Sequence, residues 1–463
     1  MKFQLRAMSL LVPLILAAVI AGDAAAATSS FLTVDLGTLG GTYSQAIAVN
    51  ERGQVIGLSS TVGDAATHAF SWTQPGGMVD LGTLGGSRSV PQAMNDAGQV
   101  IGSSAITGDA TTHAFSWTEA GGMLDLGTLG GTHSETWAVN GAGQVIGSSY
   151  TSGDFATHAF SWTQAGGMVD LSLGGSYSTA QAVNGAGKVV GTSGTAGDAA
   201  THAYSWTQAG GAIDLGTLGG GSSSALAVNA AGKVVGASAT AGDATTHAFL
   251  WTEAGGMVDL GTLGGGQSFA EFVNDAGQVI GVSETAGNAA FHAFSWTQAG
   301  GMVDLSLGGS GTSVLAVNAG GQVIGSSYTS GDVAFHAFSW TQAGGIVDLS
   351  LGGSYSAAQA VNGAGQVIGN GYTAGDAAFH AFSWTQAGGI VDLGTLGGSV
   401  SFAQGLNASG QAVGFSNTAG DATSHAVLWR AAPATKNDCK NGGWRIYGIF
   451  KNQGGCESYV NHR

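Results

Sequence analysis

Nine histidines recur along the chain at intervals of 44 or 45 residues, and each opens a phrase resembling His-Ala-Phe. Four residues before eight of them stands the Asp of a Gly-Asp pair, and Asn288 takes that place in the sixth copy. An Asp–His pair can exchange protons or bind a metal ion, so the pattern could place one such site in each repeat. Nine equivalent copies favour a structural role, because a catalytic site is normally one constellation. The histidines are His68, His113, His158, His202, His247, His292, His336, His380 and His425, and the aspartates are Asp64, Asp109, Asp154, Asp198, Asp243, Asp332, Asp376 and Asp421.

In the structural reading, the Asp caps a tight turn while the His binds the backbone or a neighbouring hydroxyl. Calcium is a further candidate, but it requires six to eight oxygens from closely spaced carboxylates and carbonyls. The chain has neither a D-x-D-x-D-G run nor a GGxGxDxU pattern, and it lacks GxSxG, HExxH and P-loop motifs. We therefore expect no metal ion, no other cofactor and no enzymatic activity.

A unique binding site would have to lie where the copies differ. His133, Glu135 and Trp137 stand together in the segment THSETW of the third repeat, where other copies carry segments such as SSSAL. An indole ring and a carboxylate can bind a sugar, so these three are candidate binding residues. The alternative is drift without function in an exposed loop.

A period of 40–50 residues indicates one supersecondary unit stacked many times. Each copy holds four short apolar runs rich in Val, Ile, Phe and Trp, separated by clusters of Gly, Asn, Asp, Ser and Thr. Such runs predict strands joined by turns, of which Asn50-Glu51-Arg52-Gly53 is one. No segment within the repeats shows a helical stripe, so the sequence predicts an all-β fold with four strands in each of nine repeats.

Alternation along these strands favours a β-propeller. In His68–Trp72 the large rings fall on one face and Ala and Ser on the other, so each sheet can stack its bulky face on the small face of a copy. The first strand, Leu32–Gly37, and the last phrase, His425–Trp429, are complementary parts of one blade, which predicts closure into a ring. Propellers usually have about four to eight blades, so an open β-solenoid or horseshoe and two smaller propellers remain alternatives.

Composition and the N-terminus bear on location. Residues 1–27 read as a secretory signal, with a basic start, an apolar stretch too short to span a bilayer and a small-residue cleavage site. No later stretch is long and apolar enough to cross a membrane. Between residues 28 and 429, four basic residues stand against 25 acidic ones, a net charge of about −21 that argues against nucleic-acid binding.

The tail, residues 430–463, differs from the repeats 28–429. It is basic and holds the only two cysteines, Cys439 and Cys456. In an exported chain such a pair predicts a disulfide, since the two cysteines and His462 are too few and too irregularly spaced for a zinc site. The segment between the cysteines resembles short two-cysteine tails of other secreted bacterial proteins.

From Val34 to Trp429 the chain resembles the bacterial HAF family of extracellular repeats. The resemblance rests on His-Ala-Phe, Asp-Leu-Gly, Leu-Gly-Gly and Asn-x-x-Gly-x-Val-x-Gly recurring in order, with Tyr204 and Val427 replacing the Phe in two copies. It implies a secreted bacterial repeat protein and no established activity. We expect a monomeric, non-enzymatic scaffold that binds or displays extracellular glycan or surface-protein partners. A structural coat or matrix protein and a propeller-based hydrolase or lyase are the alternatives.

Overall fold

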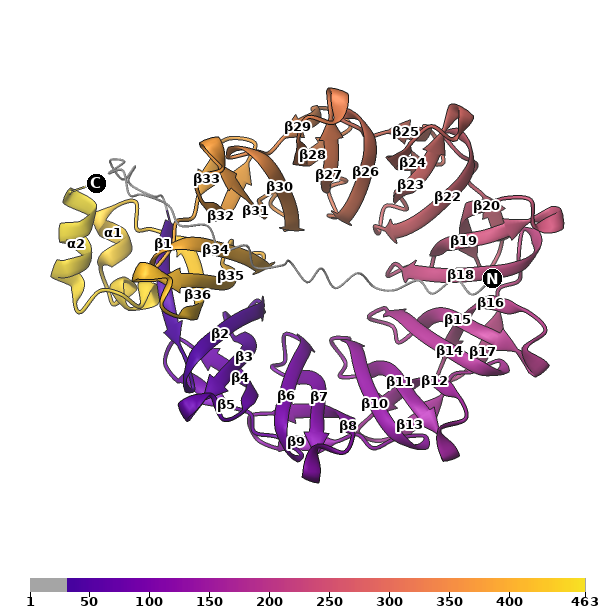
Figure 1. Ribbon diagram of the computed structural model, residues 1–463, viewed down its shortest axis with the longest axis horizontal. Coiled ribbons are helices and arrows are strands. Elements are labelled where there is room, and N and C mark those ends of the chain that lie inside the picture. The colour runs from indigo at the N-terminus through magenta and orange to yellow at the C-terminus, as the bar shows by residue number, and fades with distance from the viewer. Residues whose placement is uncertain (1–30, 463) are drawn as a thin grey trace.

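The strands of the computed structural model form one ring of four-stranded blades (Figure 1). The structure describes residues 31–462, and in this range 36 strands build nine blades. The predicted signal segment, residues 1–27, lies outside the described residues. The all-β propeller prediction is therefore confirmed, and one ring takes the place of the open solenoid and the two smaller propellers.

Each blade starts at its innermost strand, which has ten residues. The innermost strands of the nine blades together surround the ring axis (Figure 1). A second strand returns antiparallel to the first. The innermost strands are β2 (Gly40–Val49), β6 (Gly85–Met94), β10 (Gly130–Val139), β14 (Gly174–Val183), β18 (Gly219–Val228), β22 (Gly264–Val273), β26 (Gly308–Val317), β30 (Gly352–Val361) and β34 (Gly397–Leu406). The second strands are β3 (Val55–Thr61), β7 (Val100–Ile106), β11 (Val145–Thr151), β15 (Val189–Thr195), β19 (Val234–Thr240), β23 (Val279–Thr285), β27 (Val323–Thr329), β31 (Val367–Thr373) and β35 (Ala412–Thr418).

The third strand carries the His-Ala-Phe phrase, and the fourth is the short outer strand that ends at the Asp of Asp-Leu. The third strands are β4 (Thr67–Thr73), β8 (Thr112–Thr118), β12 (Thr157–Thr163), β16 (Thr201–Thr207), β20 (Thr246–Thr252), β24 (Phe291–Thr297), β28 (Phe335–Thr341), β32 (Phe379–Thr385) and β36 (Ser424–Ala431). The outer strands are β5 (Gly77–Asp80), β9 (Gly122–Asp125), β13 (Gly167–Asp170), β17 (Gly211–Asp214), β21 (Gly256–Asp259), β25 (Gly301–Asp304), β29 (Gly345–Asp348) and β33 (Gly389–Asp392), with β1 (Phe31–Gly37) in blade 9. Blades are numbered from β2–β5 as blade 1.

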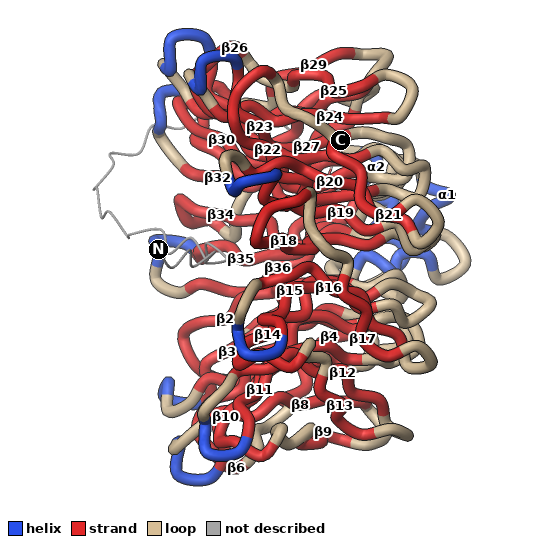
Figure 2. The backbone as a smooth tube through the Cα atoms, turned by 90° about the vertical axis from the view of Figure 1, so that its right-hand side faces the viewer, coloured by secondary structure: helices blue, strands red, loops and turns tan. Residues whose placement is uncertain are grey.

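Antiparallel alternation gives the ring two faces (Figure 2). The loop face carries a 3-10 turn that follows the second strand of each blade. The turn face carries the tight hairpin turns, such as residues 50–53 and 74–76, and the C-terminal tail. The 3-10 turns are η1 (Val62–Asp64), η2 (Thr107–Asp109), η3 (Ser152–Asp154), η4 (Ala196–Asp198), η5 (Ala241–Asp243), η6 (Ala286–Asn288), η7 (Ser330–Asp332), η8 (Ala374–Asp376) and η9 (Ala419–Asp421).

Neighbouring blades pack a bulky face on a small face, as the alternation predicts. Ile56 and Ala69 of blade 1 lie in one buried cluster with Phe115 and Trp117 of blade 2. Within a blade, Gly57 leaves the space that the Phe70 ring fills, since a Cβ at this glycine would lie 2.7 Å from the ring and 2.0 Å from the Gln45 carbonyl oxygen. The packing seen between blades 1 and 2 is repeated around the ring and builds an apolar core between each pair of neighbouring blades.

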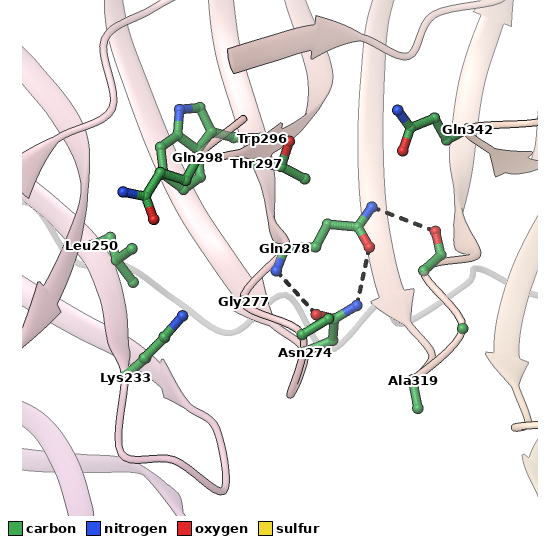
Figure 3. Close-up of a pocket in the computed structure, with 13 residues that line it drawn as sticks. Lys233, Leu250, Asn274, Gly277, Gln278, Trp296, Thr297, Gln298, Ala319 and Gln342 are labelled. Carbon is green, nitrogen blue, oxygen red and sulfur yellow. Dashed lines mark hydrogen bonds between the residues drawn. The ribbon is translucent and has the colours of Figure 1, made fainter. Parts of the chain in front are cut away.

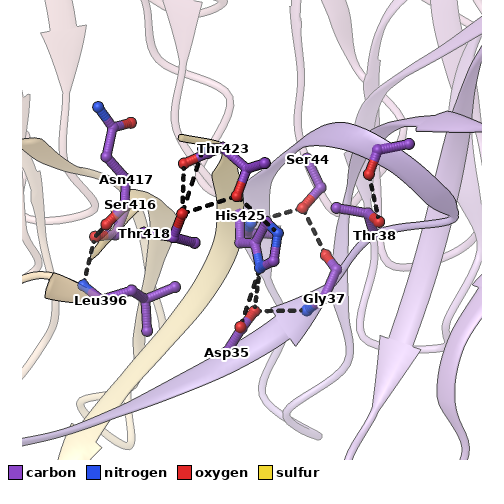
Figure 4. Close-up of polar contacts among 12 residues, drawn as sticks. Asp35, Gly37, Thr38, Ser44, Leu396, Ser416, Asn417, Thr418, Thr423 and His425 are labelled. Carbon is purple, nitrogen blue, oxygen red and sulfur yellow. Dashed lines mark hydrogen bonds and ion pairs between the residues drawn. The ribbon is translucent and has the colours of Figure 1, made fainter. Parts of the chain in front are cut away.

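Blade 9 closes the ring by joining the two ends of the repeat region (Figure 4). β1 pairs antiparallel with β36, placing Val34 opposite Leu428. Ser44 of blade 1 then donates to the Gly37 carbonyl at 2.6 Å and accepts from the Ala426 N–H at 2.7 Å. Because the chain runs directly from β1 into β2, this pairing ties the last blade covalently to the first.

A belt of asparagines crosses every blade junction on the turn face. Each Asn side chain donates from Nδ2 to the backbone carbonyl of the equivalent Asn in the next blade, at 3.0–3.3 Å. The last bond, from Asn407 to Asn50, joins blade 9 to blade 1 at 3.0 Å. The belt members among the described residues are Asn50, Asn95, Asn140, Asn184, Asn229, Asn274, Asn318, Asn362 and Asn407.

Replacing one belt residue should destabilise the ring. Asn140 is buried, donates to the Asn184 carbonyl at 3.1 Å and accepts from the Gln144 N–H at 3.0 Å. Asn140→Ala leaves these backbone groups without their partners, so we expect a loss of about 1–3 kcal/mol for each unsatisfied group. Urea unfolding of both proteins measures the difference. A change within about 0.5 kcal/mol, the range of ordinary surface substitutions, would contradict a role for the belt.

The tail folds against the outer strand of blade 9. It forms α1 (Lys436–Cys439), η10 (Gly443–Tyr447) and α2 (Gln453–Asn461), and Cys439 is paired with Cys456. Both cysteines and Tyr447 pack in one cluster with Leu32 of β1. Within residues 31–462, no helix has the length and apolar character needed to span a bilayer.

Candidate functional site

The repeat histidines pair with a different Asp from the one proposed in the sequence. His68 Nδ1 lies 2.8 Å from Oδ2 of Asp80, twelve residues later on the outer strand, and the equivalent contact recurs in all nine blades of the described chain at 2.6–3.0 Å. The blade 9 pair, His425 with Asp35, bridges the two ends of the repeat region (Figure 4). The antiparallel pairing of β4 with β5 sets Phe70 opposite Asp80, which brings the carboxylate to the imidazole.

The Asp of Gly-Asp ends the η turn without capping it, which corrects the proposed cap: its carboxylate binds the innermost strand instead. Asp64 has a φ of +55° and accepts from the Thr42 N–H at 2.8 Å, which ties the loop face to the innermost strand. That backbone hydrogen bond, followed by one from the Thr42 hydroxyl, holds the pKa of Asp64 below its ordinary value. Asn288 shows that an amide fits the same position, since its Oδ1 accepts from the Gly266 N–H at 2.8 Å.

Acid should weaken these turns. Hydrogen bonds from the Ser354 backbone and hydroxyl lower the pKa of Asp376 in the folded state. A lowered folded pKa means that the carboxylate stabilises the fold above the unfolded value, and that this contribution is lost as pH falls through the folded pKa. Asp376→Asn keeps the geometry seen at Asn288 and removes the titration. We therefore expect a shallower acid limb in a plot of melting temperature against pH. An unchanged limb would show that the Asp376 carboxylate does not contribute.

The three candidate residues of repeat 3 lie on a strand, which corrects their placement in a loop. His133, Glu135 and Trp137 are alternate residues of β10, whose pairing with β11 is irregular before Ser134 and between Thr136 and Ala138. The His133 ring lies 5.4 Å from that of Tyr150, and Glu135 accepts from the Ser148 hydroxyl at 3.4 Å. Trp137 is 40% exposed. His133 and Glu135 therefore contact side chains of β11, whereas Trp137 is exposed at an irregularity in the strand pairing.

The same alternate positions distinguish the blades from one another. Between them, the small residues equivalent to Ser44 and Ala46 stay buried. In blade 6 one of the variable positions is Glu271, and burial raises the pKa of its carboxyl to about 7. The surface at the inner strands is thus the part of the ring in which repeats carry individual chemistry.

An aromatic arc runs across blades 7, 8 and 9 near the loop face. Phe335 and Phe379 each open a third strand, a position held by Thr in blades 1 to 5. Phe335 stacks on Tyr355 at 5.8 Å, and Phe379 stacks on Phe402 at 6.1 Å. The arc comprises Tyr328, Phe335, Tyr355, Tyr372, Phe379, Phe402 and Phe415, linked by ring contacts of 4.9–6.5 Å. Tyr328 and Tyr372 are 41% and 38% exposed, so its rings reach solvent.

A cavity of about 290 Å³ opens on the turn face where blades 5, 6 and 7 meet (Figure 3). Lys233 and Leu250 of blade 5 form one side, Trp296 and Gln298 of blade 6 another, and Gln342 of blade 7 the far side. Among the described residues that line the cavity, none is acidic. The described chain also contains no cluster of three or more His, Cys, Asp or Glu suited to a metal ion.

Sequence reasoning missed the arc and the cavity, although both leave a signal. The signal is a break in the repeat: Phe replaces Thr before the His in three consecutive copies, and Lys and Leu replace Gln and Ser in blade 5. Positions that vary against a fixed register are where individual function can reside in a repeat protein.

No protein-family model matches the chain, and no curated protein is similar to it in sequence. The HAF resemblance stays a prediction. Similar solved structures include the tricorn protease (9% identity, TM-score 0.28, 83% of this chain and 39% of that one). A streptogramin B lyase is similar at 11% identity and TM-score 0.35 over 86% of this chain and 97% of the lyase. The β-propeller domain of the Trilobed protease from Pyrococcus furiosus is similar at 8% identity and TM-score 0.41, over 76% and 98% of the two chains.

These structures correct the expectation that the chain is not an enzyme. The propeller proteins similar to it include several peptidases and a lyase, so a propeller of this kind does not exclude catalysis. The chain spans about two fifths of the tricorn protease. Likeness at these identities shows the fold alone and assigns no reaction to this chain.

Proposed function

We propose that the protein is a secreted binding ring for extracellular polysaccharide. The observation that carries the proposal is the aromatic arc of blades 7 to 9. Seven rings lie in a continuous series over three blades, and two of them, Tyr328 and Tyr372, are about two fifths exposed, while the other five are partly buried. Exposed contiguous apolar surface of this kind marks an interaction site.

Aromatic rings suit a sugar polymer for physical reasons. A sugar ring presents a flat C–H surface that packs on an aromatic face, and its hydroxyls keep contact with water at the rim. Phe and Tyr supply large rigid area with little side-chain entropy to lose. Successive rings along the arc can engage successive sugars of one chain, so modest single contacts would add up to useful avidity.

Secretion is supported by three separate features. Residues 1–27 have the pattern of a signal peptide, the tail holds a paired Cys439 and Cys456, and the repeats resemble an extracellular family. Disulfides persist in oxidising compartments, and the strongly acidic repeats are unsuited to nucleic acid. These features favour an extracellular ligand over a cytosolic one.

A glycan array on the secreted protein, with calcium present and absent, tests the function. Phe335→Thr and Phe379→Thr install the residue that blades 1 to 5 carry at this register, so the fold should tolerate them. We expect both changes to weaken binding to the polysaccharides that the native ring retains. Phe155→Ala, at a ring that is 89% exposed on a separate loop, is the control and should bind as the native protein does. Failure of the native protein to bind any glycan would contradict the proposal and favour a coat or matrix role.

A second candidate is an extracellular hydrolase or lyase, favoured by Glu271. A carboxyl with a pKa of about 7 can donate or accept a proton near neutral pH, as general acid–base catalysis requires. Incubation of the native protein and Glu271→Gln with the polysaccharides that bind, followed by reducing-end assay, separates the two functions. Product release that Glu271→Gln abolishes would establish the enzyme.

A further inference from the structure

The turn-face framework uses one Gln in most blades to close the space beside each hairpin. In blade 6, Gln278 Nε2 donates to the Ser295 hydroxyl at 2.8 Å, and its Oε1 accepts from Asn274 Nδ2 at 3.0 Å. Blades 4 and 5 depart from this rule, because Lys188 and Lys233 stand in place of the Gln. Blade 5 departs twice, since Leu250 also replaces the Ser. The Gln–Ser bond is therefore found in six blades of the described ring and not in blades 4, 5 and 9, since Leu428 replaces the Ser in blade 9.

The two lysines have different surroundings. Lys188 Nζ lies 5.5 Å from the centroid of the Trp251 ring, over which its charge is stabilised. Lys233 extends into the cavity and its Nζ lies close to the backbone of Gly277 (Figure 3). A Cβ added at Gly277 would lie 2.5 Å from Lys233 Nζ. Trp296, the equivalent of Trp251, is only half-buried and lines the same cavity. Lys233 thus reaches an open space at the point where Lys188 reaches a ring.

The Lys233 ammonium forms none of the ion pairs found in the described part of the chain, so it can pair with a ligand. The ion pairs found in residues 31–462 are the nine His–Asp contacts, none of which involves Lys233. The cavity lining has no carboxylate, although the repeats carry 25 acidic residues against four basic ones. Lys233 is the one charged residue among the described residues that line the cavity, so the cavity itself favours an anionic group beside its ammonium.

We infer that this cavity binds an acidic sugar, a uronic acid unit of a polysaccharide. Its carboxylate would pair with Lys233 Nζ, its ring would pack on the Trp296 indole, and its hydroxyls would bond to the Gln298 and Gln342 amides. This inference rests on the proposed polysaccharide-binding function and names a site on the face opposite the aromatic arc. The arc, being uncharged, would hold sugars of any charge, whereas the cavity discriminates by charge.

Calorimetric titration with a galacturonic acid trimer, and with the neutral galactose trimer, tests the inference on the full secreted protein. Lys233→Gln restores the residue that seven blades carry, so folding is not in question. We expect this change to weaken binding of the acidic trimer about tenfold or more, as expected for loss of one charge-assisted contact. Lys188→Gln is the matched control at the same register and should bind the acidic trimer as the native protein does. Added salt should weaken the native interaction.

Three results would overturn the inference. These are no binding of the acidic trimer, equal binding by native protein and Lys233→Gln, or competition by acetate as effective as the sugar, which would show a site for simple anions. If glycans still bind and binding depends on Phe335 and Phe379, the polysaccharide function stands while the acidic-sugar site fails. If no glycan binds at all, both fail together.

Discussion

Deleting β1, residues 31–37, should lower the melting temperature of the entire ring as one cooperative step. This strand contributes three buried side chains, Leu32, Val34 and Leu36, to blade 9 and its tail. Burial of three aliphatic side chains stabilises the fold by about 5–9 kcal/mol in an area estimate, which is an upper bound. The deletion also cuts the covalent link between the closing blade and blade 1. Calorimetry gives the melting temperature, and hydrogen exchange shows whether all blades lose protection together.

A milder pair of variants keeps the closure test informative if the deletion does not fold. Leu36 of the closing strand and Leu260, which follows the outer strand β21 of blade 5, occupy the same repeat position, and both are buried. In a closed ring Leu36→Ala and Leu260→Ala should cost similar amounts, about 2–5 kcal/mol. Local loss of protection near blade 9, with the other blades melting as before, would instead describe an open array in which each repeat contacts only its neighbours.

Closure could be predicted because it depends on the order of segments. The repeat region opens with an Asp-Leu strand, Phe31–Gly37, and its last His-Ala-Phe strand is followed by no Asp-Leu strand. Pairing of β1 with β36 completes that blade. Strand identity and face-to-face packing were also predictable, since alternation of large and small residues decides which faces fit together.

Side-chain partners were less predictable, because they depend on register between strands. His68 is four residues from Asp64 in sequence, yet Asp64 lies at a positive φ and its carboxylate binds Thr42 of the innermost strand. Asp80 reaches His68 through the β4–β5 hairpin. The segment that holds His133 and Trp137 differs between copies, which is typical of a loop, whereas the innermost strand already starts at Gly130. A segment that begins with two glycines has a low β-strand propensity, but pairing with the second strand of the blade still makes it a strand.

The cavity at Lys233 escaped prediction for another reason. In sequence Lys233 and Lys188 look equivalent, since both replace the same Gln in adjacent repeats. Their difference arises from the next blade, where Trp251 lies under Lys188 but Trp296 leaves the space beside Lys233 open. Function at a blade junction therefore depends on two repeats at once, and comparison of single repeats does not reveal it.

Trp251→Ala should destabilise the ring far more than His247→Ala. The Trp251 ring is 9% exposed and packs against Val190 and Ala203 of blade 4, so its removal leaves a cavity between blades. We expect a loss of about 3–5 kcal/mol in the free energy of unfolding. His247 bonds to Asp259, a carboxylate that is 43% exposed and can turn to water, so its loss should cost about 1 kcal/mol or less.

Urea unfolding of the two variants measures both losses in the free energy of unfolding. Trp137→Ala is the control, because this tryptophan is 40% exposed, and we expect its free energy of unfolding to change by no more than about 0.5 kcal/mol. Glycan binding by His247→Ala should match that of the native protein, because the arc and the cavity contain no repeat histidine. If His247→Ala instead abolished binding while its unfolding curve stayed in place, the repeat histidines would form a working site in a single blade. Equal costs at Trp251 and His247 would place the stability of the ring in its polar contacts, contrary to the packing between blades.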